Sequence, residues 1–331
     1  RIEGLLKERI ARLAPSLQEA LQVGAVAGKV FAAEIIAGVL GIDVHQLTRQ
    51  LSTVLSREQR LIVALGRQQI NDQTLSQYAF RHILFQQYLY NSQDRIQRAH
   101  LHSAMAGALE RAYGDAAASI APQLARHFAI AGKWQRALHY YTLAGDAAAA
   151  VYANAEAAAH YRSAIALLKG SESDGSDGDA TRVKQGALLD LYRRLGRTLE
   201  LSSHHDEAIA AYEEMEYAAQ AQADQTMELA SLLARAAIRT TVNFARDPAE
   251  GRALLDRAGA LASEMDDRAA EAAILWNLLI LSAYTGGDLT QRLRYGEEAL
   301  SLARAVADPE QLAFTPVSYT HLTLPTTRQR C

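Results

Sequence analysis

The segment LASEMD, residues 261–266, ends a helical run in the same way as AAQAQAD at 218–224 and LARAVAD at 302–308. The three closing aspartates are spaced 42 residues apart along the chain. A second aspartate, in HHDEA, ARDPAEG and GGDLTQ, recurs every 41 residues between amphipathic runs: Asp206, Asp247 and Asp288. A fixed period of this length predicts stacked helical hairpins, because one hairpin alone cannot bury its apolar face.

Shorter helical units precede these repeats. GKWQRALHYYTLAG at 132–145 and NAEAAAHYRSAIALL at 154–168 both resemble the second helix of a tetratricopeptide repeat, and the longer period resembles extended members of that class. The resemblance covers roughly two thirds of the chain. It predicts tetratricopeptide-like hairpins over residues 96–169 and further repeats of about 42-residue period over 181–316. Between them, residues 170–180 have the composition of a flexible acidic loop, in which nothing fixes the carboxylates for a metal.

The first 95 residues show a different pattern of predicted secondary structure, with both helices and strands. IEGLLKERIARL, SLQEALQVGAVA and FAAEIIAGVLG predict helices, and Asp43 can cap a further helix over 43–55. LIVAL at 61–65 predicts a short strand, RQQINDQT a polar hairpin tip, and LSQYAF at 75–80 the return strand. Helices followed by a two-stranded wing indicate a winged helix. The predicted fold class is therefore all-α: a winged helix over residues 1–95, then an α-α superhelix of tetratricopeptide-like repeats.

The end of the chain differs in composition from the helical repeats. Residues 317–331 read VSYTHLTLPTTRQRC, and VSYTHLTLPTT resembles a translated sequencing adapter. We therefore expect residues 317–331 to be non-native, and the single Cys331 says nothing about redox compartment or catalysis. Because the chain also starts at Arg1 without a Met, we expect it to be a piece of a larger protein.

Charge and hydropathy exclude some classes of function. The 331 residues carry a net charge of −3, so the bulk composition shows no affinity for polyanions. The predicted helix at 43–55 offers Arg49 and His45 but no lysine, and phosphate contacts normally dominate DNA affinity, which argues against direct DNA recognition. The longest apolar stretch, 272–284, is too short to span a bilayer. We expect a cytoplasmic protein without membrane contact.

Three sequence patterns resemble a phosphate loop or a metal site, but the spacing or position of their residues does not suit such a site. GAVAGKV at 24–30 has too few residues between its glycines for a phosphate loop and follows no strand, so we expect a helix-to-helix turn. HHDE at 204–207 occupies a repeat turn without a second ligand pair at helical spacing. His100 and His102 are two residues apart and do not share a helix face. We predict neither catalytic nor metal-binding residues, and thus no enzyme and no cofactor in this chain.

The stretch YAFRHILFQQYLY, residues 78–90, begins like a strand and continues at helical spacing. It resembles the junction in bacterial signal-transduction ATPases with numerous domains, whose winged helix runs as F-R-H-x-L-F/I-Q into an aromatic helix. The matching residues are Phe80, Arg81, His82, Leu84, Phe85, Gln86 and Tyr88. The resemblance implies that His82, helped by Arg81, senses the phosphates of a nucleotide. The alternative, equally open, is that His82 caps the helix or packs on Phe85 and Tyr88.

The same resemblance implies a function. Such ATPases bind ATP or ADP with magnesium in a core that would lie upstream, and some are fused to an adenylate cyclase or a transcriptional regulator. The chain would then be a regulatory region whose repeats bind a protein or peptide on their concave face, while the winged helix relays that event to the core. Two alternatives stay open: an independent tetratricopeptide scaffold, and a fragment of a DNA-binding transcriptional regulator.

Overall fold

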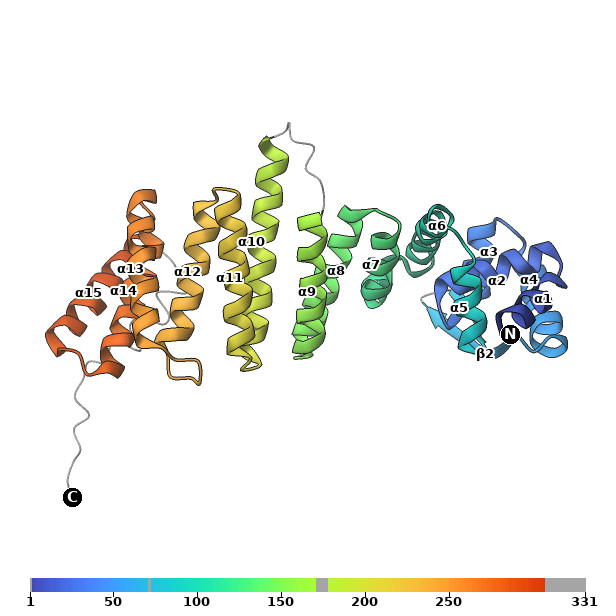
Figure 1. Cartoon of the computed structure of the whole chain (residues 1–331), viewed down its shortest axis with the longest axis horizontal. Helices are drawn as coiled ribbons and strands as arrows, with labels where there is room; N and C mark the ends of the chain where they lie inside the picture. The colour runs from blue at the N-terminus through green and yellow to red at the C-terminus, as the bar shows by residue number, and fades with distance from the viewer. Residues whose placement is uncertain (1, 71–72, 171–177, 307–331) are drawn as a thin grey trace, which may run out of the picture. The chain divides into compact units, whose positions relative to one another are not determined.

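A computed structural model describes residues 2–70, 73–170 and 178–306 (Figure 1). The chain is mostly helical, with one small sheet, and divides into two compact units, residues 1–172 and 173–331. The tail at 317–331 lies outside the described residues, as does most of the loop at 170–180. Only the edges of that loop are described, since Gly170 ends one helix and Gly178 begins the next.

The first unit begins with short helices around a sheet. Its elements up to residue 91 are α1 (Ile2–Ala11), α2 (Pro15–Ala27), β1 (Val30–Ala32), α3 (Ala33–Leu40), α4 (Val44–Gln50), the π-helical segment η1 (Leu51–Glu58), β2 (Ile62–Ile70), β3 (Gln73–Phe80) and α5 (Ile83–Asn91). The predicted cap is confirmed, because the Asp43 carboxylate accepts a hydrogen bond from the Gln46 amide at 2.7 Å. The helix predicted over 43–55 continues to Glu58 by passing from α4 into η1.

The sheet has three antiparallel strands in the order β1-β3-β2, one more than the predicted two-stranded wing. The extra strand comes from the segment FAA, which the sequence indicated as the start of a helix. Val30 pairs with Ala79 and Phe31 with Tyr78, and the Phe31 ring lies 5.2 Å from that of Phe80. Burial of Phe31 among these rings favours an extended backbone over an added helical turn.

The turn at 24–30 also differs from its prediction. Residues 24–27 belong to helix α2, and the chain then enters strand β1, so the turn joins a helix to a strand. Gly28 makes this turn with a φ of 123°, a backbone conformation that residues other than glycine rarely adopt. A phosphate loop requires the opposite order, a strand before the glycines.

The rest of the first unit is helical. It consists of α6 (Arg95–Tyr113), the 3₁₀ segment η2 (Gly114–Ile120), α7 (Ala121–Ile130), α8 (Trp134–Ala150) and α9 (Asn154–Gly170). One apolar core extends from Ile10 on α1 to Ala144 on α8. The sheet-containing segment and the first helical hairpins are thus packed around a common interior, with Phe80 and Phe128 among its largest buried side chains.

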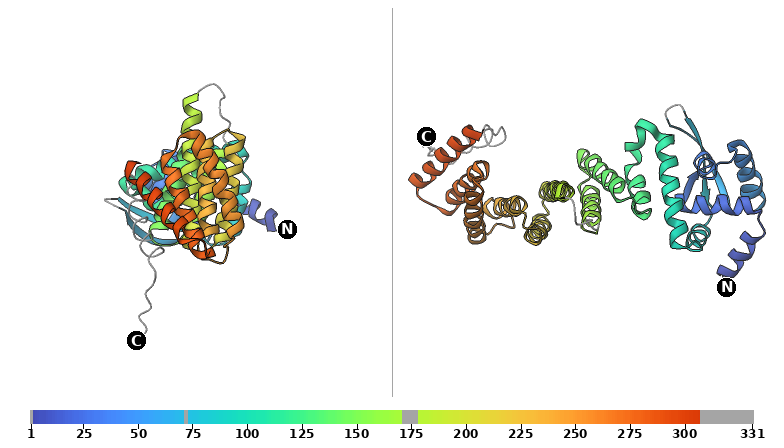
Figure 2. Two further views of the ribbon diagram at one scale, coloured as in Figure 1. Left: turned by 90° about the vertical axis from the view of Figure 1, so that its left-hand side faces the viewer. Right: turned by 90° about the horizontal axis from the view of Figure 1, so that it is seen from above.

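The second unit contains six described helices: α10 (Gly178–Leu201), α11 (His205–Ala221), α12 (Gln225–Thr240), α13 (Pro248–Met265), α14 (Arg268–Thr285) and α15 (Leu289–Val306). Each helix packs against the next in the chain, and α12 also contacts α14. Figures 1 and 2 show this succession, with neighbours in the sequence lying side by side. A buried cluster of Leu and Ala side chains joins α12, α13 and α14.

Four of the five recurring aspartates within the described residues lie at helix ends, and Asp308 lies outside those residues. Asp224 and Asp247 are N-cap residues of α12 and α13, with carboxylates that accept backbone amide hydrogens at 3.0 Å. Asp266 ends α13 in the left-handed conformation, and Asp288 accepts from the Gln291 amide at the start of α15. Asp206 differs, since it lies inside the first turn of α11. The period therefore reflects where helices begin and end.

Candidate functional site

Arg81 and His82 lie at the junction of β3 and α5, as the sequence predicted. The Arg81 amide donates to the Leu61 carbonyl at 3.0 Å, and the His82 carbonyl accepts from the Phe85 amide at 3.1 Å. Both side chains are exposed. His82 occupies the N-cap position, yet in the described structure its imidazole makes no capping hydrogen bond. The backbone is thus fixed by hydrogen bonds while both side chains are exposed to solvent.

The neighbouring residues divide into a buried and an exposed set. Phe80 and Phe85 are in the core, and the side-chain Nε2 of Gln86 donates to the Ala25 carbonyl at 2.7 Å, which attaches α5 to α2. Ile83 and Leu84 are 45% and 49% exposed beside His82. The His82 ring lies 6.2 Å from that of Phe85, at the edge of a ring contact. Residues 81–84 therefore form an exposed surface that combines polar and apolar side chains, called the junction surface below: Arg81, His82, Ile83 and Leu84.

The structure contains a buried histidine pair that was not predicted from the sequence. His102 on α6 and His127 on α7 are almost fully buried, and their Nδ1 atoms lie 2.8 Å apart. The Nε2 atom of His102 is 3.1 Å from the Tyr90 hydroxyl. The pKa of His102 is lowered to about 4 and that of His127 to about 3, mainly by burial, with a smaller contribution to both from the charge of Arg126. The pair is neutral at physiological pH and joins two helices.

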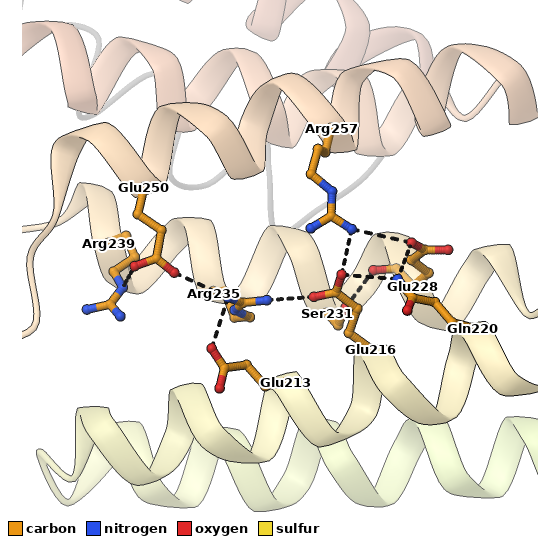
Figure 3. A network of polar contacts seen from close by, with 9 residues as sticks. All are labelled: Glu213, Glu216, Gln220, Glu228, Ser231, Arg235, Arg239, Glu250 and Arg257. Carbon is orange, nitrogen blue, oxygen red and sulfur yellow. Dashed lines mark hydrogen bonds and ion pairs between the residues drawn. The ribbon is translucent and has the colours of Figure 1, made fainter.

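A network of ion pairs joins α11, α12 and α13 (Figure 3). Arg235 on α12 is at its centre, with nitrogens 2.5 Å from Glu216, 3.0 Å from Glu213 and 3.2 Å from Glu250. Glu250 also contacts Arg239 at 2.7 Å, and Arg257 contacts Glu216 at 2.5 Å. The side chains of Arg235 and Glu216 are each only 11% exposed. These charges compensate one another, so we assign the network a structural role.

A groove of about 460 Å³ lies between α13 and α15 over α14. Its walls are mainly apolar, from Ile274, Leu275 and Leu302. Gly259 contributes open space, because a Cβ added there would meet no atom within 4 Å. Two carboxylates, Glu271 and Glu298, complete the lining, together with Ser301. The groove thus combines apolar side chains with negative charge, a pattern that suits a cationic, amphipathic binding partner.

The other residues considered in the sequence do not assemble a site. His204 precedes α11, and residues 205–207 form the first turn of that helix instead of a loop. Over the described parts of the chain, no three His, Cys, Asp or Glu side chains are grouped to hold a metal ion. Within the same residues, no helix is both long and apolar enough to cross a bilayer.

No protein-family model matches the chain, and no curated protein matches it either.

Proposed function

We propose that this chain is the regulatory, protein-interaction region of a signal-transduction ATPase. In this proposal the first 95 residues are a winged helix, and the later hairpins are tetratricopeptide-like repeats that bind a partner. The winged helix relays partner binding to a nucleotide-binding core, which supplies the sites for ATP or ADP and magnesium. The chain itself catalyses no reaction.

The observation that carries the proposal is the groove on α13, α14 and α15. Helix-in-groove recognition places apolar side chains at helical spacing into such a surface. Ile274, Leu275 and Leu302 supply the apolar contact, and Glu271 and Glu298 favour lysine or arginine at the edges of the partner. The expected partner segment is therefore a basic amphipathic helix.

The junction surface supports the relay. Arg81 and His82 are held by backbone hydrogen bonds at the end of a strand, and their side chains are available to an adjacent domain. Charge-assisted hydrogen bonds from such groups to phosphate oxygens are among the stronger polar contacts in proteins. The exposed Ile83 and Leu84 add an apolar contact beside them.

An independent scaffold would use the same groove without the relay. The two functions differ in what the junction surface does, because a scaffold requires no contact between His82 and a nucleotide. Nucleotide exchange by the full-length protein distinguishes them: partner binding alters its rate in the regulatory case and leaves it unchanged in the scaffold case.

Peptide binding tests the groove directly. The probes are two labelled helical peptides, one of leucine and lysine and one of leucine and glutamate, measured by fluorescence anisotropy. We expect the lysine peptide to bind, and Gly259→Leu to weaken it at least about tenfold by filling the groove. Gly186→Leu is the matched control, since that α10 glycine also has open space around it. Equal affinity for both peptides, or no effect of Gly259→Leu, would contradict the proposal.

A further inference from the structure

A second cavity, of about 530 Å³, lies in the first unit between α4, η1 and the β2–β3 hairpin. Unlike the groove on the repeats, it is lined largely by polar and charged side chains. The lining residues are Glu34, Val44, His45, Thr48, Arg49, Ser52, Arg67, Thr74 and Ser76. We call it the wing pocket.

Two arginines reach the wing pocket from different elements. Arg49 comes from α4 and Arg67 from β2, and neither has an ion-pair partner among the described residues. His45 also lines the pocket, and its imidazole N–H can donate a further hydrogen bond. The one carboxylate, Glu34, already accepts a hydrogen bond from the Ser76 amide at 2.7 Å. Positive charge therefore exceeds negative charge in the pocket.

Hydroxyl groups complete a donor set. The Ser52 hydroxyl shares a 2.7 Å hydrogen bond with the Tyr78 hydroxyl, and that of Thr74 donates to the Gln69 side chain at 2.7 Å. The hydroxyls of Thr48 and Ser76 have no partner within the described chain and can donate to a ligand. Guanidinium and hydroxyl donors that converge from two sides match the several oxygens of a phosphate.

We propose that the wing pocket binds a small phosphate-bearing molecule, such as pyrophosphate or a nucleoside diphosphate. The cavity has the size of a small-ligand site. Nucleic acid is disfavoured, because its affinity comes from many phosphate contacts along an extended surface and this pocket has two arginines beside a carboxylate. Thr74 and Ser76 of the pocket lie near the start of β3, whereas Arg81 and His82 follow the end of that strand. The proposed site is therefore separate from the junction surface.

Calorimetric titration at low ionic strength tests the inference on the whole chain. The probes are inorganic phosphate, pyrophosphate, ADP without magnesium, and a short DNA duplex. We expect saturable one-to-one binding of pyrophosphate or ADP, weakened about tenfold or more by Arg49→Gln and by Arg67→Gln. Stronger binding of ADP than of pyrophosphate would identify a nucleotide, and equal binding would identify the phosphates alone as the recognised group.

The control is Arg57→Gln, which removes an exposed arginine of η1 that does not line the pocket. Loss of binding in this control to the same extent, or no saturable binding to the unmodified chain, would overturn the inference. Tighter binding of the duplex with the same sensitivity to Arg49 and Arg67 would overturn it in favour of a nucleic-acid surface. Because the peptide experiment concerns the groove on α13–α15 and not the wing pocket, failure of either experiment leaves the other unaffected.

Discussion

At the residue scale, the helical hairpins depend on tyrosines that pack on glycines. Tyr161 lies against Gly145, and Tyr212 lies against Gly196 at the same sequence separation. Each tyrosine hydroxyl donates to a carboxylate on the glycine-bearing helix, Tyr161 to Asp146 at 2.8 Å and Tyr212 to Glu200 at 2.7 Å. Burial, reinforced by Glu200, raises the pKa of Tyr212, so its hydroxyl stays protonated. The absence of a Cβ lets the two helices approach closely.

Gly196→Ala tests this contact. The new Cβ would overlap the ring of Tyr212, so we expect a loss of about 1 to 3 kcal/mol in the free energy of unfolding. Gly186→Ala, on the same helix α10, meets no neighbour and should stabilise the chain by up to about 1 kcal/mol. Urea denaturation followed by far-UV circular dichroism measures both. Similar effects of the two substitutions would show that the close approach is unimportant.

Arg235 presents a second residue-scale test. Arg235→Gln removes one of the two arginines that contact the largely buried Glu216 carboxylate at 2.5 Å, and it also removes the contacts of Arg235 with Glu213 and Glu250. We expect the free energy of unfolding to fall by about 3 kcal/mol, the range for breaking a buried pair. Arg252→Gln is the control, because Arg252 and Asp256 form an exposed pair at 2.9 Å, worth less than about 1 kcal/mol. Equal losses in urea denaturation would mean that the network contributes no more than surface charge.

At the scale of elements, the His102–His127 pair makes the packing of α6 on α7 sensitive to acid. Both residues have a folded-state pKa below the ordinary 6.5, so the unfolded chain binds more protons at lower pH. Stability should fall as the pH drops below about 6.5, by about 1.4 kcal/mol per pH unit for each histidine, until the folded-state pKa values are reached. The two histidines contact each other, and His102 also contacts the Tyr90 hydroxyl. The charged side chains near the pair are Arg98 and Arg126.

Urea denaturation at about pH 7 and about pH 5 measures this effect. The double variant His102→Gln, His127→Gln should show a shallower dependence of stability on pH than the unmodified chain. His100→Gln, an exposed position on the same helix, should keep the original slope. Parallel pH profiles for the double variant and the unmodified chain would contradict the assigned cause.

The sequence was most informative about helix boundaries. Aspartates such as Asp224 and Asp247 cap helices through local hydrogen bonds, so a local pattern suffices to find them. The third strand was missed because β1 forms by pairing Phe31 with Tyr78, far along the chain. The histidine pair was missed for the same reason: His102 was compared with its neighbour His100, whereas its true partner is on another helix.

At the scale of the whole molecule, the periodic aspartates predicted a succession of helices but not the surfaces between them. The groove depends on how far α13 and α15 stand apart over α14, which no repeat period specifies. The wing pocket likewise requires Arg49 and Arg67 to face one cavity from a helix and a strand. Among the candidate sites, the sequence indicated only the pair Arg81 and His82. These motif residues are adjacent in the chain, so they can be recognised without knowledge of any tertiary contact.

The proposed relay predicts that one substitution has different effects in this chain and in the ATPase that we propose to carry it. His82 is exposed and caps nothing with its side chain, so His82→Ala should change the stability of this chain by less than about 0.5 kcal/mol. In the proposed full-length ATPase the same substitution would remove a donor to the nucleotide in one conformation only, and should shift the conformational equilibrium by about 1 to 3 kcal/mol. Dissociation of a fluorescent ADP analogue measures that shift as faster release.

Gln87→Ala is the control for this experiment, because Gln87 is an exposed position of the same helix α5 and should affect neither quantity. Severe unfolding of the isolated chain by His82→Ala would show that the histidine is structural. Unchanged ADP release from the full-length variant would instead remove His82 from the relay. Only the asymmetry, a stable isolated chain with altered nucleotide release in the whole protein, fits a side chain that is fixed at its backbone and acts on a ligand held by another domain.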